Sequence, residues 1–229
     1  MQKSRFRQTR TLGAIAALLA TPLAAAAGPL CEPFSELAIH LEENRTDGDG
    51  EIVLVAKGDE DGLRRLRITA PNGKQYEFRA PKSGIGILQF VFESSEPTDL
   101  QEIFDSFPAG AYAVRGTTVE GDCLNGSATL SHAAAPAPSI LTPAEGAVVA
   151  PDAFVVTWSP VAGVAGYLVE LTNEDSGQEL RIDLDASETR FEVPSDWLVP
   201  GTPYEVIIAA TSAATGNVAS NQVIVTTEP

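Results

Sequence analysis

Residues 37–42 read Leu-Ala-Ile-His-Leu-Glu, and every second residue in this stretch is a large apolar one. A period of two places those side chains on one face, as in a half-buried β-strand. The same alternation recurs at residues 88–92, and Glu51–Ala56 is predicted to be a further strand. Pro71-Asn-Gly73 favours a turn, because Pro fixes φ and Asn-Gly tolerates positive φ. The amino-terminal half is therefore predicted to be a mostly antiparallel β-sandwich.

One short helix is expected within this half. Its apolar residues recur at the i, i+3, i+4 and i+7 positions of one helical face: Leu100, Ile103, Phe104 and Phe107. Thr98 lies three residues before Gln101, which is the spacing of a capping box, so Thr98 is the expected N-cap. Pro108 and Gly110 are expected to end the helix.

Residues 1–27 have the three parts of a secretory signal: basic residues, a short apolar segment and a small-residue site ending at Ala27. We expect cleavage near Ala27 and a secreted or periplasmic mature chain. The apolar segment is shorter than the roughly 20 residues that a membrane-spanning helix needs, and no later segment approaches that length. A lipid on Cys31 is disfavoured, because Pro29 and Leu30 are poor fits to the small residues that such a cleavage site prefers.

The charge of the chain narrows the classes of partner. The 229 residues carry 15 Lys and Arg against 31 Asp and Glu, a formal charge of −16. Without the four basic residues of the signal, 11 Lys and Arg remain and the net charge becomes −20. Binding to nucleic acid depends on Lys and Arg, so no nucleic-acid partner is expected. A cationic partner or a divalent ion would be attracted, though weakly at physiological salt.

Two cysteines, Cys31 and Cys123, lie in a chain that is expected to reach an oxidising compartment. We expect them to form a disulfide that ties the amino end to the last strand of the first domain. In the loop-entropy model, a bridge that closes about 90 residues stabilises by roughly 4–5 kcal/mol at most. The sequence has no CxxC pattern, so the bridge is expected to be structural rather than redox-active.

The segment 132–138 is poor in charge and rich in Ala and Pro, as in a short and fairly stiff linker. The expected organisation follows from it: a signal peptide (1–27), an amino-terminal sandwich (28–133), a linker (134–138) and a carboxyl-terminal domain (139–229). Each of the two larger parts, at roughly 90 to 105 residues, suffices for one β-sandwich core. The expected fold class is all-β, with two sandwiches and one short helix.

Four stretches of the carboxyl-terminal half match, in residues and spacing, the strands of a known domain family. They are Val155-Val-Thr-Trp158-Ser-Pro160, Gly166-Tyr167-Leu-Val-Glu170, Phe191-Glu-Val-Pro194 and Leu198-Val-Pro-Gly-Thr-Pro-Tyr204. With them, residues 139–229 resemble a fibronectin type III domain. The resemblance implies that Trp158 and Tyr167 are core residues and that Leu198 and Tyr204 form the corner where the sixth strand begins. No Arg-Gly-Asp tripeptide is present, so an integrin-style role is unsupported. Residues 107–114 of the first half look, more loosely, like a late strand of bacterial immunoglobulin-like domains.

The densest acidic segment is Asp47-Gly-Asp49-Gly-Glu51. Gly permits tight turns that converge carboxylates on a hard cation, so Asp47, Asp49 and Glu51 are candidate Ca²⁺ ligands. The segment does not fit the EF-hand template, because acids are missing from its first and twelfth positions. We favour a solvated hairpin turn here and at the second acidic segment, Asp59–Gly62. No other cofactor is expected.

The basic cluster Arg64, Arg65 and Arg67 can clamp a carboxylate or a phosphate. Pairing with the acidic segment before it, or with acids across the sheet, is the favoured interpretation. Trp197 either stacks on a sugar from an exposed loop or plugs the edge of the sandwich, and we favour the second. Neither His40 nor His132 has a nucleophile in a recognised motif nearby, and no GxSxG, SxxK or HExxH pattern is present.

These observations predict an exported, non-enzymatic interaction or structural module that recognises a protein or a cell surface. The first alternative is a carbohydrate-binding or calcium-dependent adhesion module that uses Asp47, Asp49, Glu51 and Trp197. A remote alternative is a hydrolase with a carboxylate pair, although nothing selects two of the 31 acids. The sequence leaves the identity of a protein or polysaccharide partner open.

Overall fold

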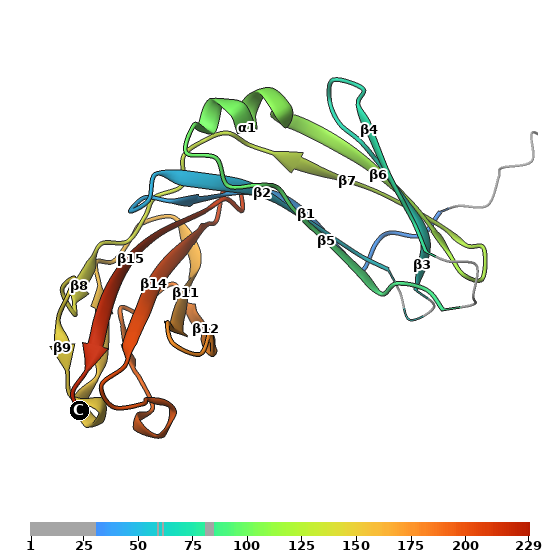
Figure 1. Cartoon of the computed structure of the whole chain (residues 1–229). Coiled ribbons are helices and arrows are strands. Elements are labelled where there is room, and N and C mark those ends of the chain that lie inside the picture. The colour runs from blue at the N-terminus through green and yellow to red at the C-terminus, as the bar shows by residue number, and fades with distance from the viewer. Residues whose placement is uncertain (1–30, 59, 61, 81–84) are drawn as a thin grey trace, which may run out of the picture. The chain divides into compact units, whose positions relative to one another are not determined.

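The computed structural model describes residues 31–58, 60, 62–80 and 85–229 (Figure 1). The signal segment 1–27 lies outside the described residues, and so do Asp59 and Asp61 of the second acidic segment. Residues Cys31–Pro229 form one compact unit. No helix in the described part of the chain is long and apolar enough to cross a membrane.

The structure is nearly all β with one short α-helix, which confirms the predicted fold class. The strands of the first half are β1 (Glu36–Asn44), β2 (Asp49–Lys57), β3 (Leu63–Thr69), β4 (Gln75–Arg79), β5 (Gln89–Glu93), β6 (Gly110–Thr118) and β7 (Cys123–Leu130). Those of the second half are β8 (Ile140–Thr142), β9 (Val148–Val149), β10 (Val155–Trp158), β11 (Val164–Asn173), β12 (Glu179–Asp185), β13 (Arg190–Glu192), β14 (Pro203–Ser212) and β15 (Val218–Thr227). The helices are α1 (Leu100–Ser106) and two single 3₁₀ turns, η1 (Pro151–Ala153) and η2 (Ser195–Trp197).

In the first half, a sheet in the order β4-β3-β6-β7 packs against β1, β2 and β5 (Figure 1). The apolar residues of the alternating segments point between the two layers, as the period of two predicts. The fully buried members of this cluster come from both layers and include Leu41, Ile52, Leu66, Val114 and Leu124. The first half is therefore a sandwich with one core.

The helix α1 lies at the end of the four-stranded sheet, directly before β6 (Figure 1). Its N-cap is Asp99, whose side chain accepts a hydrogen bond from the Gln101 amide, so the prediction of Thr98 as N-cap is wrong by one residue. A carboxylate at this position also interacts favourably with the helix dipole. Ile103 is buried in the core, while Leu100 and Phe104 pack at its margin.

The second half is also a sandwich, with the sheet β13-β10-β8 packed against β12, β11, β14 and β15. Its buried cluster takes Trp158 from one layer and Tyr167, Val206 and Val225 from the other. The strands of both layers are antiparallel, apart from the short β9, which pairs in parallel with β15.

One sheet runs through both halves, which no sequence pattern indicated. The end of β1 pairs in parallel with the start of β15, where Glu42, Glu43 and Asn44 lie opposite residues 218–220. The resulting eight-stranded sheet includes the order β12-β11-β14-β15-β1-β2-β5. The halves are thus joined by backbone pairing as well as by the connecting segment.

A buried amide, Asn217, completes this junction. Its side-chain oxygen accepts a hydrogen bond from the Leu41 amide at 3.2 Å, and its nitrogen donates to the carbonyls of Ser131 and Ala133 at 3.0 and 2.8 Å. Asn221 donates in the same way to the Pro138 carbonyl at 2.8 Å. The Ala/Pro segment is therefore held at one end by the residue before β15 and at the other by β15 itself.

Candidate functional site

The predicted disulfide is confirmed: Cys31 and Cys123 are bonded, with their Cα atoms 4.8 Å apart. The chain next to Cys31 continues beside β7, where the Glu32 amide donates to the Cys123 carbonyl and the Asn125 amide donates to the Glu32 carbonyl, both at 2.9 Å. The bridge thus fixes the start of the described chain to the edge of the four-stranded sheet.

The aromatic residues of the carboxyl-terminal half fill its core. Trp158, Tyr167 and Tyr204 are each 2% exposed or less, and Leu198 is also buried. The Tyr204 hydroxyl accepts a hydrogen bond from the Val199 amide at 2.8 Å, which closes the corner before β14. Trp158 meets Tyr167 edge to face, with ring centroids 5.6 Å apart. These side chains pack the sandwich and do not present a binding surface.

Trp197 lies in the 3₁₀ turn η2, at the margin of the same core. It is half-buried, and its ring packs against Tyr204 with centroids 5.4 Å apart. This packing is the geometry of a side chain that plugs the sandwich edge. A sugar would have to stack on the remaining exposed part of the indole.

Of the acidic segment, Asp47 and Gly48 lie in the turn between β1 and β2, whereas Asp49 and Glu51 belong to β2 itself. Gly48 supplies the positive φ of this turn, and the Asn44 side chain accepts a hydrogen bond from the Thr46 amide. The Asp47 carboxylate accepts from the side chains of Asn44 and Gln222 at 3.3 and 3.1 Å. Asp47 thus contacts β15, a partner that its sequence neighbourhood does not reveal.

Asp49 and Glu51 line an acidic hollow of about 550 Å³ in which β1, β2, β11 and β15 take part. Its carboxylates come from both halves of the chain: Glu42, Glu43, Asp49, Glu51, Glu93, Glu96, Glu170 and Asp183. Two of them hold guanidinium groups, because Glu43 pairs with Arg45 at 2.7 Å and Glu170 with Arg181 at 3.0 Å. Among the described residues, no group of three or more His, Cys, Asp or Glu side chains is arranged to hold a metal ion.

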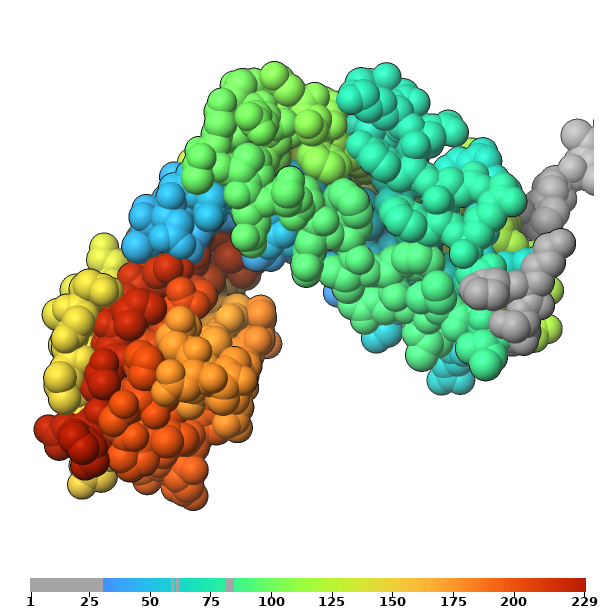
Figure 2. Space-filling model, in the orientation of Figure 1, coloured from blue at the N-terminus to red at the C-terminus, as the bar shows by residue number. Residues whose placement is uncertain are grey.

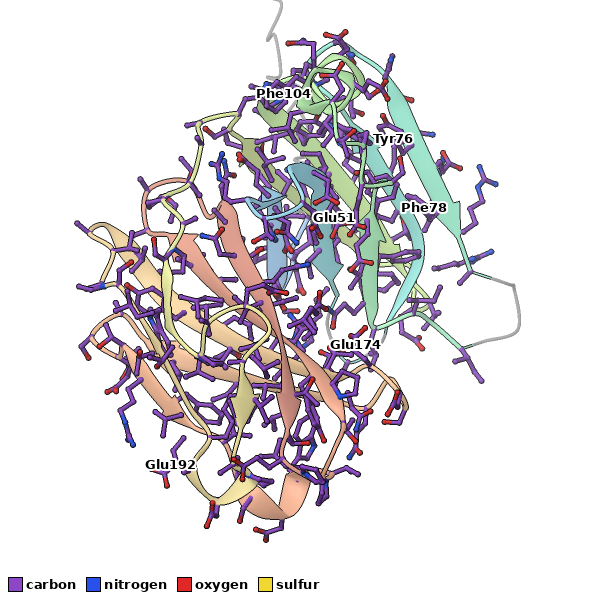
Figure 3. The ribbon with its side chains drawn as sticks, turned by 60° about the vertical axis from the view of Figure 1, so that its left-hand side comes forward. Glu51, Tyr76, Phe78, Phe104, Glu174 and Glu192 are labelled. Atoms are coloured by element: carbon purple, nitrogen blue, oxygen red, sulfur yellow. A yellow bond between two sulfur atoms is a disulfide. The ribbon has the colours of Figure 1, made fainter. Side chains whose placement is uncertain are left out.

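Burial and neighbouring negative charges raise the pKa of two carboxyl groups that line this hollow. Desolvation of the Glu51 carboxylate, which lies on β2 (Figure 3), raises its pKa from 4.5 to about 7, and repulsion from Glu42, Glu96 and Glu93 adds to the effect. Burial also raises the pKa of Glu170, although the neighbouring Arg181 opposes that shift. The hollow is therefore a place where a cationic group would relieve repulsion between carboxylates.

Two of the three predicted basic residues pair across the sheet. Arg65 and Arg67 contact the Glu77 carboxylate of β4 at 2.7 and 2.9 Å, and Arg79 approaches the same carboxylate. The three guanidinium groups lower the Glu77 pKa from 4.5 to about 2 through hydrogen bonds to its charged form. The partner is thus a residue that follows the cluster by ten residues or more, on the neighbouring strand.

The two histidines make different contacts. His40 contacts the Glu42 carboxylate at 2.7 Å on the polar face of β1. His132 contacts the Phe107 carbonyl at 2.7 Å, and its ring stacks on Phe104 with centroids 4.1 Å apart. The His40 contact lies within a single strand, whereas the His132 contacts hold the segment after β7 against the helix α1 and the residue that follows it.

Comparison with known proteins identifies the second half. Residues 142–226 match the family model of the fibronectin type III domain, so the chain carries one such domain there. Comparison with curated proteins gives no match.

Two solved structures are similar at low identity. A crystal structure of the FN1–FN3 domains of chicken CNTN1 is 15% identical with a TM-score of 0.36 and covers 87% of this chain, which spans 65% of the length of that one. A segment of two fibronectin type III domains from chicken tenascin is 17% identical with a TM-score of 0.32, covering 83% of this chain and 97% of its own. The identification of the domain therefore rests on the family match.

Proposed function

We propose that the chain is a non-enzymatic interaction or structural module that acts outside the cytoplasm and recognises a protein partner. A fibronectin type III domain and a disulfide-tied sandwich support a role of this kind. The observation that carries it is the eight-stranded sheet shared by both halves, with Asn217 buried at the junction. Because backbone pairing joins the two sandwiches, they present their surfaces as one unit.

The acidic hollow is the concave surface to which both sandwiches contribute. Its carboxylates already hold Arg45 and Arg181, so they accept guanidinium groups in a geometry that the chain itself demonstrates. A partner with exposed Lys or Arg side chains would gain from the charge of this surface, and the gain would fall with salt. The calcium-dependent alternative uses some of the same carboxylates and remains a second candidate through the repulsion around Glu51.

Binding of short labelled peptides tests this function. An oligo-lysine peptide should bind the mature chain and be released as salt rises, whereas an oligo-glutamate peptide of equal length should not. The double variant Glu93→Gln/Glu96→Gln should weaken binding of the cationic peptide, because both exposed carboxylates line the hollow. Glu188→Gln/Glu192→Gln changes the net charge equally and serves as control, since neither residue lines it and Glu192 lies on β13 (Figure 3).

Equal weakening by both double variants would mean that only net charge attracts the peptide, and would contradict recognition by the hollow. A second measurement, with calcium, distinguishes the calcium-dependent alternative from the proposed function. A ligand at 100 times its Kd raises the free energy of unfolding by about 2.7 kcal/mol, so a melting curve with Ca²⁺ and with chelator should coincide under the proposed function and separate under the calcium-dependent one.

A further inference from the structure

The outer face of the sheet β4-β3-β6-β7 is basic in a strongly acidic chain. Its four strands carry one acidic residue, Glu77, against five arginines. Apolar side chains such as Leu66, Phe78 and Val114 point into the core, so the residues alternating with them form the outer face. That face places four arginines together: Arg65, Arg67, Arg79 and Arg115. We call it the arginine face.

The register of the strands sets like charges directly opposite each other. Arg65 lies opposite Arg79, and Arg67 lies opposite Arg115. Directly opposed like charges destabilise a sheet pair, so this face carries an electrostatic cost within the folded chain. An anion bound between the rows would relieve it.

The chain shows how the arginine face receives an oxyanion. The Glu77 carboxylate accepts from Arg67 Nε and Nη2 at 3.2 and 2.9 Å, from Arg65 Nη2 at 2.7 Å, and also from Arg79. One carboxylate therefore serves three guanidinium groups, which leaves an excess of two positive charges. The Nε atom of Arg65 is buried and has no hydrogen-bond partner, and within the described residues no ion pair involves Arg115.

A hollow of about 440 Å³ lies beside this cluster, on the side of β6 and β7. It is lined by Arg65, Arg67 and Arg115, together with the polar side chains of Thr117 and Asn125. A second hollow of about 280 Å³ shares Arg65 and Thr117 with it and adds Arg79. The Cys31–Cys123 disulfide borders the first hollow and fixes its rim.

We propose that this hollow binds a phosphate or sulfate group, either as the free anion or as the ester of a small ligand, held by Arg65, Arg67 and Arg115. Planar guanidinium groups donate paired hydrogen bonds to such groups, which accounts for arginine in preference to lysine at every basic position of the face. A long polyanion fits less well, because the rest of the chain is acidic. The site lies in the first sandwich, apart from the acidic hollow, and does not depend on the function proposed above.

Titration calorimetry of the full mature chain at low ionic strength tests the site with two probes, inorganic phosphate and glucose 6-phosphate. Arg115→Gln should weaken the binding of either probe by about tenfold, the usual scale of one lost charge-assisted contact. Arg190→Gln, an exposed arginine of β13 that pairs with Glu192, is the matched control and should change binding less than twofold. Tighter binding of the sugar phosphate would identify an ester as the natural source, and tighter binding of phosphate would identify the free anion.

Glu77→Gln separates a binding site from a purely structural cluster. Loss of the internal carboxylate releases three arginines, so the ligand should bind several-fold more tightly even if the variant is less stable. The proposal is overturned if neither probe binds, if Arg115→Gln binds as well as the unmodified chain, or if Glu77→Gln leaves the affinity unchanged.

Discussion

The two sandwiches close their edges in different ways. In the fibronectin type III domain, Trp158, Tyr167 and Tyr204 are buried, and the Tyr204 hydroxyl ties the corner to the backbone of Val199. In the first sandwich, the edge strands β4 and β5 adjoin each other (Figure 2), and half-buried aromatic pairs such as Phe78 and Phe90 fill the space between them. Figure 3 labels Tyr76 and Phe78, two of these aromatic residues, on β4.

This difference teaches where the stability of each half comes from. The second sandwich has an edge closed by packing and by backbone hydrogen bonds of its own. The first has a disulfide at one edge of its four-stranded sheet, and the pairing of β1 with β15 is shared equally by both halves. We infer that the second half is stabilised by its own packing, that the first depends more on its covalent bridge, and that the junction contributes to both.

The largest expected effect is on the core of the second sandwich. Trp158→Ala should lower its free energy of unfolding by about 3–5 kcal/mol, because a fully buried aromatic is replaced by a cavity. Urea denaturation followed by the fluorescence of Trp197 measures this loss. Trp197→Ala, followed by circular dichroism, should cost clearly less because Trp197 is only half-buried. Equal losses in the two variants would contradict the inferred division between core and margin.

The disulfide should matter almost as much, but to the other half. Cys31→Ser/Cys123→Ser should lower the free energy of unfolding of the first sandwich by roughly 2–5 kcal/mol, because the unfolded chain gains conformational entropy when its loop is no longer closed. Hydrogen exchange resolved by residue shows which strands lose protection. Faster exchange in β3, β6 and β7, with β11 and β14 unchanged, is the expected result; a uniform change would show that both halves unfold together.

The junction should contribute less than either core. Asn217→Ala removes three hydrogen bonds and leaves the Leu41 amide and two carbonyls without that partner, which costs about 1–3 kcal/mol when such groups are buried. Chemical denaturation of the variant and of the unmodified chain measures this loss. Asn221→Ala is the control, since it removes two hydrogen bonds at a half-buried position, one to the Pro138 carbonyl and one from the Thr46 hydroxyl, and should cost less.

The smallest effect is a change of stability with pH at the acidic hollow. The Glu51 pKa is about 7 in the folded chain and near 4.5 when the chain unfolds, so the folded state binds more protons between these values. Stability from this group is therefore highest below about pH 4.5 and falls as pH rises through 7. Glu51→Gln should stabilise by about 1 kcal/mol at pH 8, after allowance for solvent screening, and by nothing at pH 4. Chemical denaturation of the unmodified chain and the variant at both pH values measures it.

The alternation of apolar residues was sufficient to predict the strands and the sandwich class, because each strand buries one face locally. The resemblance of residues 139–229 to the fibronectin type III family agrees with the match over 142–226. The helix was placed correctly, but its N-cap shifted to Asp99, since two adjacent residues both had suitable side chains. The disulfide followed from the number of cysteines and the expected compartment.

Long-range contacts could not be predicted in this way. Nothing near Asn217 or Leu41 in the sequence indicates that the two meet across 176 residues. The arginine face depends on the register of three strands, which places Arg79 and Arg115 beside Arg65 and Arg67. The sequence indicated the basic cluster at residues 64–67, but not that Arg79 and Arg115 lie beside it.

Amide hydrogen exchange at Leu41 and Arg45 tests the shared sheet most directly. The acceptors of these two amides lie in the other half of the chain, at Asn217 Oδ1 and the Ser220 carbonyl, 3.2 and 2.9 Å away. Both amides should exchange as slowly as those in the middle of β14, and Asn217→Ala should accelerate Leu41. Exchange of both at the rate of an exposed turn such as Gly73 would contradict a sheet that joins the two sandwiches.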